Sequence, residues 1–247
     1  MKIALISGTS TGIGLALATA LLARGWQVHG IGRSSPGSLQ NHPDYRHFIC
    51  DLSDLEKLPK AMARFLADRP GLKQIDLVCL NSGQFCEAMR RISETPVQEL
   101  LQLQALNCFS AKLILDALIG ADLTLPLCLV SASIAGKRAR AGNGGYALSK
   151  ATLNMMMELY ALEHPETFFA VIGLCAVDTF LSNKIATLSL PDNPVFTPQA
   201  LLRARAVTPG YVATPDQRAA QLLSLLVPGP DPRLASGQFV EVRSLVS

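Results

Sequence analysis

The sequence has few charged residues and no dense cluster of basic ones. Of its 247 residues, 17% are Asp, Glu, Lys or Arg, and the formal net charge is only +3. The longest basic cluster, Lys137, Arg138 and Arg140, is too short to contact nucleic-acid phosphates along a whole face. We therefore expect no nucleic-acid partner, and we interpret this cluster as a solvated loop that could also border a substrate cleft.

Long apolar runs and paired cysteines are also lacking. The apolar N-terminal stretch is interrupted at residues 7–12, and no continuous run reaches the length of a membrane span. We therefore expect a soluble, cytoplasmic protein with no membrane partner. The six cysteines form no CxxC pair and have no metal-ligand spacing with the four histidines. Because most of them lie in apolar runs, we expect reduced, buried thiols and no metal site.

Apolar residues, in contrast, make up 49% of the chain and fall in short runs. Continuous apolar runs of this length are typical of parallel strands that are buried on both faces. We expect such strands at residues 2–6, 27–31, 46–50, 75–80, 127–131, 168–174 and 238–242. Helical patterns occupy residues 13–24, 55–68, 96–119, 146–163 and 215–226. Thr95 should be the N-cap of the third helix, with Pro96 at its first position.

Strands that alternate with helices predict an α/β fold. Right-handed crossovers then give a Rossmann-type, doubly wound parallel sheet of about seven strands, with helices on both faces. No repeat, low-complexity tract or shift in composition divides the chain, so we expect a single domain over residues 1–247. Residues 178–213 show no clean period and are rich in Pro, Thr and Ser, which indicates a loop.

A glycine-rich turn lies between the first predicted strand and the first helix, and reads Ser7-Gly8-Thr9-Ser10-Thr11-Gly12-Ile13-Gly14. Glycines there let the backbone approach a pyrophosphate, and the helix N-terminus offers free N–H groups. Such glycines can also serve packing alone, but their place in the first strand–helix unit favours a dinucleotide. The second strand ends near Arg33 and Ser34 with no carboxylate, and an arginine there suits the 2′-phosphate of NADP. We therefore expect NADP(H) in preference to NAD(H).

Tyr146 and Lys150 are four residues apart near the start of a predicted helix, so their side chains share one helix face. A positive charge one turn away should lower the pKa of the tyrosine from its usual value of about 10 and make it a more efficient proton donor. Ser133 follows the predicted strand at 127–131 and could donate a hydrogen bond to a substrate oxygen. Each residue alone could be an ordinary packing or solvated residue, and their joint spacing favours catalysis.

With these motifs, the chain resembles the short-chain dehydrogenase/reductase superfamily over almost all of its length. Residues 7–14 are similar to the family's TGxxxGIG turn, and residues 81–83 are similar to its Asn-Ala-Gly motif. The resemblance implies four catalytic residues: Asn107, Ser133, Tyr146 and Lys150. In the family, the asparagine organises a water relay to the lysine, and the lysine holds the nicotinamide ribose.

The resemblance also implies a cofactor site, and in one place the chain departs from the family. The implied cofactor residues are Gly8, Ser10, Thr11, Gly12, Ile13, Gly14, Arg33, Ser34, Asp51, Leu52, Asn81, Ser82, Gly83, Tyr146, Lys150, Val177 and Thr179. After the sixth strand the family has Pro-Gly-x-Val-x-Thr, whereas this chain has Leu174 and Cys175 in place of Pro-Gly. This change affects the segment that shapes the nicotinamide pocket.

Within the superfamily, the last third of the chain is most similar to the sepiapterin reductase and benzil reductase branch. The resemblance implies an NADPH-dependent reductase of a small ketone or vicinal dicarbonyl, with Glu241 as a substrate anchor and residues 178–213 as the substrate-binding loop. Another alcohol dehydrogenase, a 3-oxoacyl reductase and a non-catalytic NADP(H)-binding regulator are the alternatives. The family also implies a homodimer or homotetramer.

Overall fold

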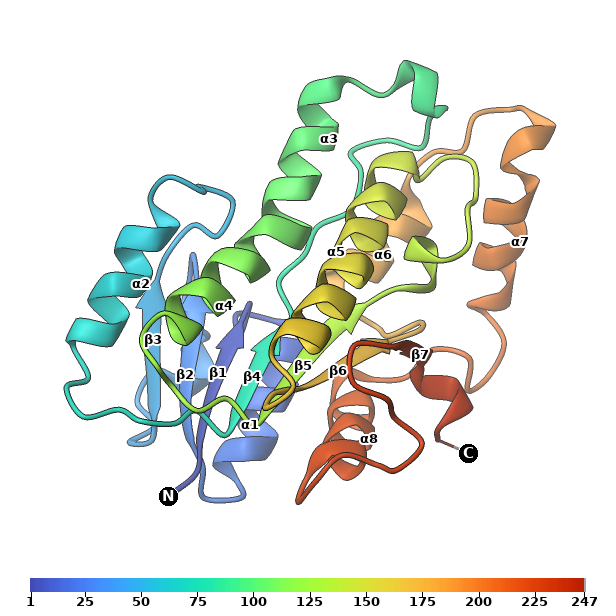
Figure 1. Ribbon diagram of the computed structural model, residues 1–247. Helices are drawn as coiled ribbons and strands as arrows, with labels where there is room; N and C mark the ends of the chain where they lie inside the picture. Colours follow the sequence, from blue (N-terminus) through green and yellow to red (C-terminus); the bar gives the residue numbers. More distant parts are fainter. Residues whose placement is uncertain (247) are drawn as a thin grey trace.

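Seven parallel strands form the centre of the molecule (Figure 1). The computed structural model describes residues 1–246. The strand order is β3-β2-β1-β4-β5-β6-β7, so the direction of crossover reverses between β1 and β4. The strands are β1 (Ile3–Ser7), β2 (Gln27–Gly32), β3 (Tyr45–Ile49), β4 (Leu77–Leu80), β5 (Leu127–Ala132), β6 (Phe168–Gly173) and β7 (Phe239–Glu241). The predicted doubly wound Rossmann-type sheet is confirmed, and ligands of such sheets bind at the carboxyl ends of the strands near the reversal.

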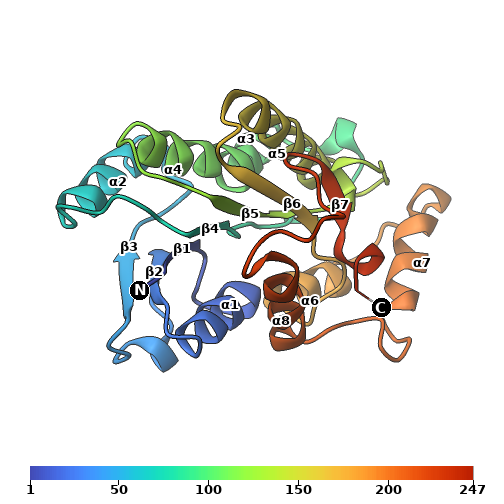
Figure 2. The same cartoon turned by 60° about the horizontal axis from the view of Figure 1, so that its bottom comes forward.

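Helices cover both faces of the sheet, as Figure 2 shows. One face carries α2 (Leu58–Ala67), α3 (Val97–Gln104), α4 (Ser110–Ile119) and α5 (Gly144–Glu163). The other face carries α1 (Gly12–Leu22), α6 (Phe180–Thr187) and α8 (Pro215–Leu226), with α7 (Thr197–Arg205) at the side. Each face has its own buried apolar core, because every interior strand is apolar on both sides.

The helix predicted over residues 96–119 is divided in three. A π-helical turn, η3 (Ala105–Phe109), separates α3 from α4. The predicted N-cap is wrong: Pro96 is the N-cap residue, and the Thr95 hydroxyl donates instead to the carbonyl oxygen of Arg91, at 3.0 Å. Proline has no backbone N–H that could be left unsatisfied, so it fits the N-cap position as well as the first helical position. The π turn is a local widening that side-chain periodicity does not reveal.

The segment predicted as a loop over residues 178–213 contains two helices. α6 begins after Thr179, whose side chain caps it by accepting a hydrogen bond from the Ser182 N–H at 3.2 Å. α7 follows a short 3-10 turn, η5 (Pro194–Phe196). Both helices are short, and Gln199 is the single buried residue in the two of them, so they leave no regular apolar pattern.

Within residues 1–246, no helix is both long and apolar enough to span a membrane, and no group of His, Cys, Asp and Glu side chains is arranged to hold a metal ion. Five of the six cysteines are buried free thiols, as predicted, and Cys175 is half-buried.

Candidate active site

The glycine turn closes tightly onto the start of α1. Gly8 and Gly12 adopt the left-handed backbone conformation, with φ of 74° and 58°, which side chains other than glycine rarely tolerate. A Cβ on Gly14 would collide with the carbonyl oxygen of Gly8, so the helix approaches the turn closely only because residue 14 is glycine. Thr11 is the N-cap residue but makes no side-chain capping bond. The first N–H groups of α1 therefore remain available to a phosphate.

Three predicted residues after β4 border this turn. The Ser7 hydroxyl accepts hydrogen bonds from the N–H groups of Asn81 at 2.9 Å and Ser82 at 3.1 Å, which joins β1 to β4. The Ser82 hydroxyl is buried without a partner, and a Cβ on Gly8 would lie 3.0 Å from it. A Cβ on Gly83 would lie 3.8 Å from the Lys150 Nζ. A glycine cradle beside an orphaned buried hydroxyl fits a polar ligand, so these residues suit a dinucleotide.

The residues predicted to hold the adenosine end follow β2 and β3. Arg33 and Ser34 are exposed, and the charge of Arg33 contributes to lowering the pKa of Asp51. The larger causes of that lowered pKa are hydrogen bonds from the side chain and N–H of Ser53. Leu52 is buried and belongs to the core under α2. The structure therefore brings Arg33 and Asp51 near each other at the carboxyl end of the sheet.

Ser133 and Tyr146 lie together at the end of β5. Ser133 is the first residue after that strand, and its hydroxyl accepts a hydrogen bond from the Ala135 N–H at 3.2 Å. Tyr146 lies in the first turn of α5. Burial raises the pKa of its phenol, and a hydrogen bond with the Ser133 side chain opposes that rise. The Ser133 side chain is thus near enough to the Tyr146 phenol to affect its pKa.

Lys150 lies beside the Tyr146 ring, on the same helix face as the spacing predicts. Its ammonium group is buried and donates a hydrogen bond to the Ser131 carbonyl oxygen at 2.8 Å. Nζ lies 5.8 Å from the centroid of the Tyr146 ring, and burial lowers the pKa of Lys150 to about 8. The predicted lowering of the Tyr146 pKa by Lys150 is wrong for this structure, because burial of the phenol dominates and raises it.

Asn107 lies in the π turn and is buried. Its Nδ2 donates to the Gln84 carbonyl oxygen and to the Ser149 hydroxyl, both at 2.9 Å, and its Oδ1 accepts from the Gln84 N–H at 2.8 Å. The amide therefore ties the segment after β4 to α5, which carries Tyr146 and Lys150. Both Nδ2 hydrogens are used in these bonds, and the water relay implied by the resemblance stays a prediction.

The segment after β6 meets the glycine turn from the other side. A Cβ on Gly12 would lie 3.2 Å from the Thr179 Cγ2, and Val177 is buried and pairs with Ala213. Cys175, which stands where the family has glycine, has a φ of 58°. Its thiol lies 3.7 Å from the Glu241 Oε1. The contacts described for Glu241 thus join it to Cys175, and none of its hydrogen bonds reaches Ser133 or Tyr146.

An apolar wall beside Tyr146 was not predicted from the sequence. It consists of four buried residues, with Tyr146 and residues from and after α6 packed against them: Phe85, Cys86, Met89, Leu103, Leu181, Ile185, Leu188 and Leu190. The rings of Phe85 and Tyr146 are tilted by 50°, with centroids 4.9 Å apart. The position of Phe85, soon after the 81–83 motif, was an available signal, whereas the α6 residues fall in the segment without a period.

Comparisons with known proteins give consistent results. The family model described as short chain dehydrogenase matches residues 2–187. An uncharacterized oxidoreductase of Schizosaccharomyces pombe is 28% identical, over 99% of this chain and 98% of its own. Benzil reductase ((S)-benzoin forming) of Bacillus subtilis is 26% identical, over 100% of both chains. Among solved structures, the KRED1-Pglu enzyme has a TM-score of 0.80 at 22% identity, over 97% of this chain and 100% of its own, which shows a shared fold.

Proposed function

Since the chain belongs to the short-chain dehydrogenase family of oxidoreductases, which bind nicotinamide cofactors and act on small molecules, we propose that it is an NADPH-dependent carbonyl reductase. The observation that carries the proposal is the placement of the Ser133 and Tyr146 side chains together at the carboxyl end of β5, with Lys150 beside the Tyr146 ring. Two hydroxyl donors at that place can bind one carbonyl oxygen.

The proposed mechanism assigns one task to each side chain. A nicotinamide cofactor held at the glycine turn would supply the hydride that the carbonyl carbon accepts. Ser133 donates a hydrogen bond to the carbonyl oxygen as negative charge develops on it, and Tyr146 transfers its phenolic proton to the same oxygen. Lys150 provides a positive charge nearby, and Asn107 keeps the segment after β4 fixed against α5.

The substrate we propose is a small ketone or vicinal dicarbonyl with an aromatic or bulky apolar substituent. Phe85 and Met89 offer apolar and aromatic surface directly beside the Tyr146 ring. α6, from the 178–213 segment, adds aliphatic side chains to the same cluster, which supports this segment as the substrate-covering part of the chain. The similarity to a benzil reductase supports an aromatic diketone as the first compound to test.

The proposed cofactor preference is NADP(H) over NAD(H). Arg33 and Ser34 follow β2, where a carboxylate would be needed to bind the 2′-hydroxyl of NAD. Both side chains are exposed, and Arg33 is free to meet a 2′-phosphate because no carboxylate lies within salt-bridge distance among the described residues.

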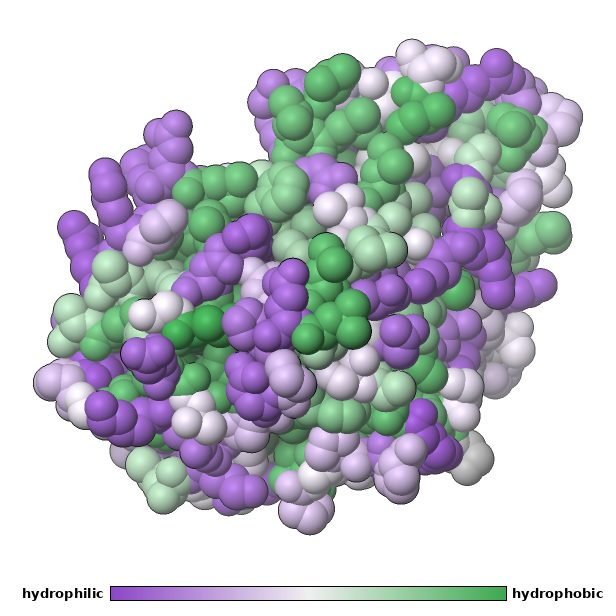
Figure 3. Space-filling view, in the orientation of Figure 1, coloured by the Kyte–Doolittle hydropathy of each residue, from purple (hydrophilic) through white to green (hydrophobic). Residues whose placement is uncertain are grey.

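We also propose a homodimer, as members of the family commonly oligomerise. The outer face of α5 exposes a helical stripe of apolar residues, and α3 exposes Val97 and Leu101 beside it. Figure 3 shows hydrophobic surface over both helices. The residues of the α5 stripe are Leu148, Met155, Leu159 and Leu162. Exposed apolar side chains gathered on two neighbouring helices are typical of a protein interface.

The experiment is to follow NADPH absorbance with a panel of diketones, ketones and aldehydes, for the wild-type protein and for Tyr146→Phe. We expect turnover of aromatic diketones by the wild type, and a loss of about 100-fold or more in kcat without the proton donor. NADPH affinity should change little. Full turnover by Tyr146→Phe would overturn the mechanism, and tight NADPH binding without turnover of any carbonyl would indicate a non-catalytic dinucleotide-binding protein.

A further inference from the structure

Three polar side chains, two of them buried and the third (His47) half-buried, meet under the glycine turn on the α1 face of the sheet. The Thr9 hydroxyl lies 2.8 Å from the Tyr45 hydroxyl, which lies 2.9 Å from the His47 Nδ1. The His47 Nε2 lies 3.1 Å from the Gly32 carbonyl oxygen. Thr9 and Tyr45 are almost completely buried. These side chains form a continuous chain of hydrogen bonds, which we name the Thr9–Tyr45–His47 network.

The chemistry of the groups gives each hydrogen bond a direction. A carbonyl oxygen can only accept, so the His47 Nε2 carries the hydrogen that it donates to Gly32. The Nδ1 of a neutral imidazole then accepts from the Tyr45 hydroxyl, and the Tyr45 oxygen accepts from Thr9. Burial lowers the pKa of His47, which agrees with the neutral ring. Every member of the network is therefore satisfied.

Gly30 on β2 leaves the space that the network fills. A Cβ at this position would collide with the Tyr45 hydroxyl and would lie 2.5 Å from the Thr9 Oγ1 and 2.8 Å from the His47 Nδ1. Gly30 does not have a positive φ, so its backbone conformation would accept other residues. Residue 30 therefore lacks a side chain because the network fills that space, and not because the backbone needs a positive φ there.

The two ends of the network lie in the two segments proposed to hold the cofactor. Thr9 follows Gly8 within the pyrophosphate turn, and Gly32 immediately precedes Arg33. Burial raises the pKa of the Tyr45 phenol, and the Thr9 hydroxyl opposes that rise. Tyr45 and His47 come from β3, outside the predicted cofactor motifs.

We propose that the Thr9–Tyr45–His47 network is a positioning device for the dinucleotide, which holds the pyrophosphate turn and the 2′-phosphate segment at a fixed separation. Its residues act through Gly8 and Arg33 and need not touch the cofactor. A preset site binds more tightly because less freedom is lost when the ligand binds. The proposal rests on the proposed dinucleotide site, and it deepens the choice of NADPH because one end of the network fixes the Arg33 segment.

The test is direct titration of NADPH and NADH by nicotinamide fluorescence, with four variants. Tyr45→Phe removes only the central hydroxyl, and Thr9→Val removes the terminal one with little change of shape. We expect NADPH affinity to fall about 5- to 10-fold in each, as for loss of one buried hydrogen bond, with a smaller loss for NADH. Thr9→Ser keeps the hydroxyl and should restore affinity, whereas Gly30→Ala should weaken binding at least as much as Tyr45→Phe.

Matched controls separate positioning from general stability. Tyr160→Phe removes another tyrosine hydroxyl, near the end of α5, which donates to Asp116 of α4. Gly37→Ala adds a methyl group where no atom lies within 4 Å. Both controls should bind NADPH like the wild type. In turnover assays, Tyr45→Phe should raise the KM for NADPH and leave kcat and the carbonyl KM nearly unchanged.

The outcomes separate this inference from the proposed function. Lowered melting temperatures with unchanged NADPH and NADH affinities in the Thr9→Val, Tyr45→Phe and Gly30→Ala variants would overturn the inference. An equal loss of NADPH affinity in the Tyr160→Phe and Gly37→Ala controls would overturn the inference too. A wild type that binds NADPH but reduces no carbonyl would refute the proposed reaction only, because the titrations measure binding without turnover.

Discussion

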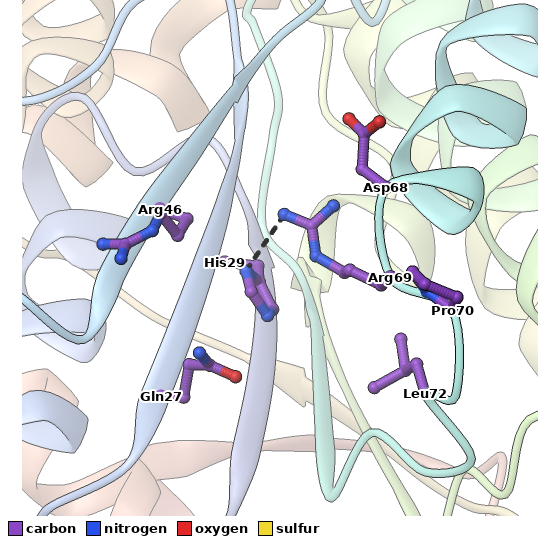
Figure 4. A pocket seen from close by; sticks show the side chains of 7 residues that line it. All are labelled: Gln27, His29, Arg46, Asp68, Arg69, Pro70 and Leu72. Carbon is purple, nitrogen blue, oxygen red and sulfur yellow. Dashed lines mark hydrogen bonds between the residues drawn. The ribbon is translucent and has the colours of Figure 1, made fainter.

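The buried imidazole of His29 should make the folded state sensitive to acid. His29 lies on β2, is 4% exposed, and faces a pocket of about 340 Å³ on the α2 side of the sheet (Figure 4). The Arg69 Nη2 donates to its Nδ1 at 3.4 Å, so that nitrogen carries no proton. Burial, and then the charges of Arg69 and Arg46, lower the pKa of His29 to about 4 from 6.5. A proton on this ring would be buried next to a cation.

The magnitude follows from the difference between the folded and unfolded pKa values. Because the folded pKa is the lower one, the unfolded chain takes up the proton first, and acidification below pH 6.5 favours unfolding. The pKa is 6.5 in the unfolded chain and about 4 in the folded protein. This difference lowers the free energy of unfolding by about 2 kcal/mol at pH 5 and about 3 kcal/mol at pH 4, relative to pH 7. Above pH 6.5 the contribution vanishes.

The assay is urea unfolding of the wild type and of His29→Gln at pH 7, 5 and 4. The glutamine has no titrating ring, and its carbonyl oxygen can still accept from Arg69. We expect the free energy of unfolding to fall between pH 7 and pH 5 by about 2 kcal/mol less in His29→Gln than in the wild type. His42→Gln, at a half-buried imidazole on the loop before β3, should follow the wild type. Parallel pH profiles for wild type and His29→Gln would refute the reasoning.

Three further predictions concern cofactor choice, backbone strain and assembly. Arg33→Ala should weaken NADPH binding by about 10-fold and leave NADH binding unchanged in fluorescence titrations, since a charge-assisted phosphate contact is lost; equal losses for both would contradict the 2′-phosphate role. Cys175→Gly should raise stability to urea by about 0.5–1 kcal/mol, because relief of left-handed strain exceeds the added chain entropy; an equal effect of Cys175→Ala would contradict this. Met155→Glu with Leu159→Glu should give a smaller species by analytical ultracentrifugation with unchanged circular dichroism, and an unchanged mass would refute the α5 interface.

The sequence was sufficient to predict the sheet because interior parallel strands are apolar on both faces. The run at 127–131 and β5 differ by one residue, and α8 has the predicted bounds of 215 and 226. α6 and α7 were missed because they are short and half-exposed, so their apolar residues follow no period. The π turn around Asn107 also leaves the surrounding helical pattern intact, and only backbone geometry shows it.

The candidate site was predictable where spacing along the chain implies proximity, as for Tyr146 and Lys150 on one helix or for the glycine turn before α1. It was not predictable where contacts join distant segments. Phe85 meets Tyr146 across about sixty residues of sequence, and His47 reaches Gly32 from a neighbouring strand. The direction of a long side chain is also hidden from sequence, and the Lys150 ammonium group points to the Ser131 carbonyl oxygen.

The raised pKa of Tyr146 has a consequence for the direction of the proposed reaction. At neutral pH its phenol is protonated, which is the form that a proton donor needs during reduction of a carbonyl. Oxidation of an alcohol requires the phenolate as proton acceptor, and burial disfavours the phenolate. We therefore expect reduction to proceed at pH 6–7 and oxidation to rise steeply with pH above neutrality, in initial rates measured in both directions. An oxidation rate that is independent of pH between 6 and 9 would contradict Tyr146 as the group that exchanges the proton.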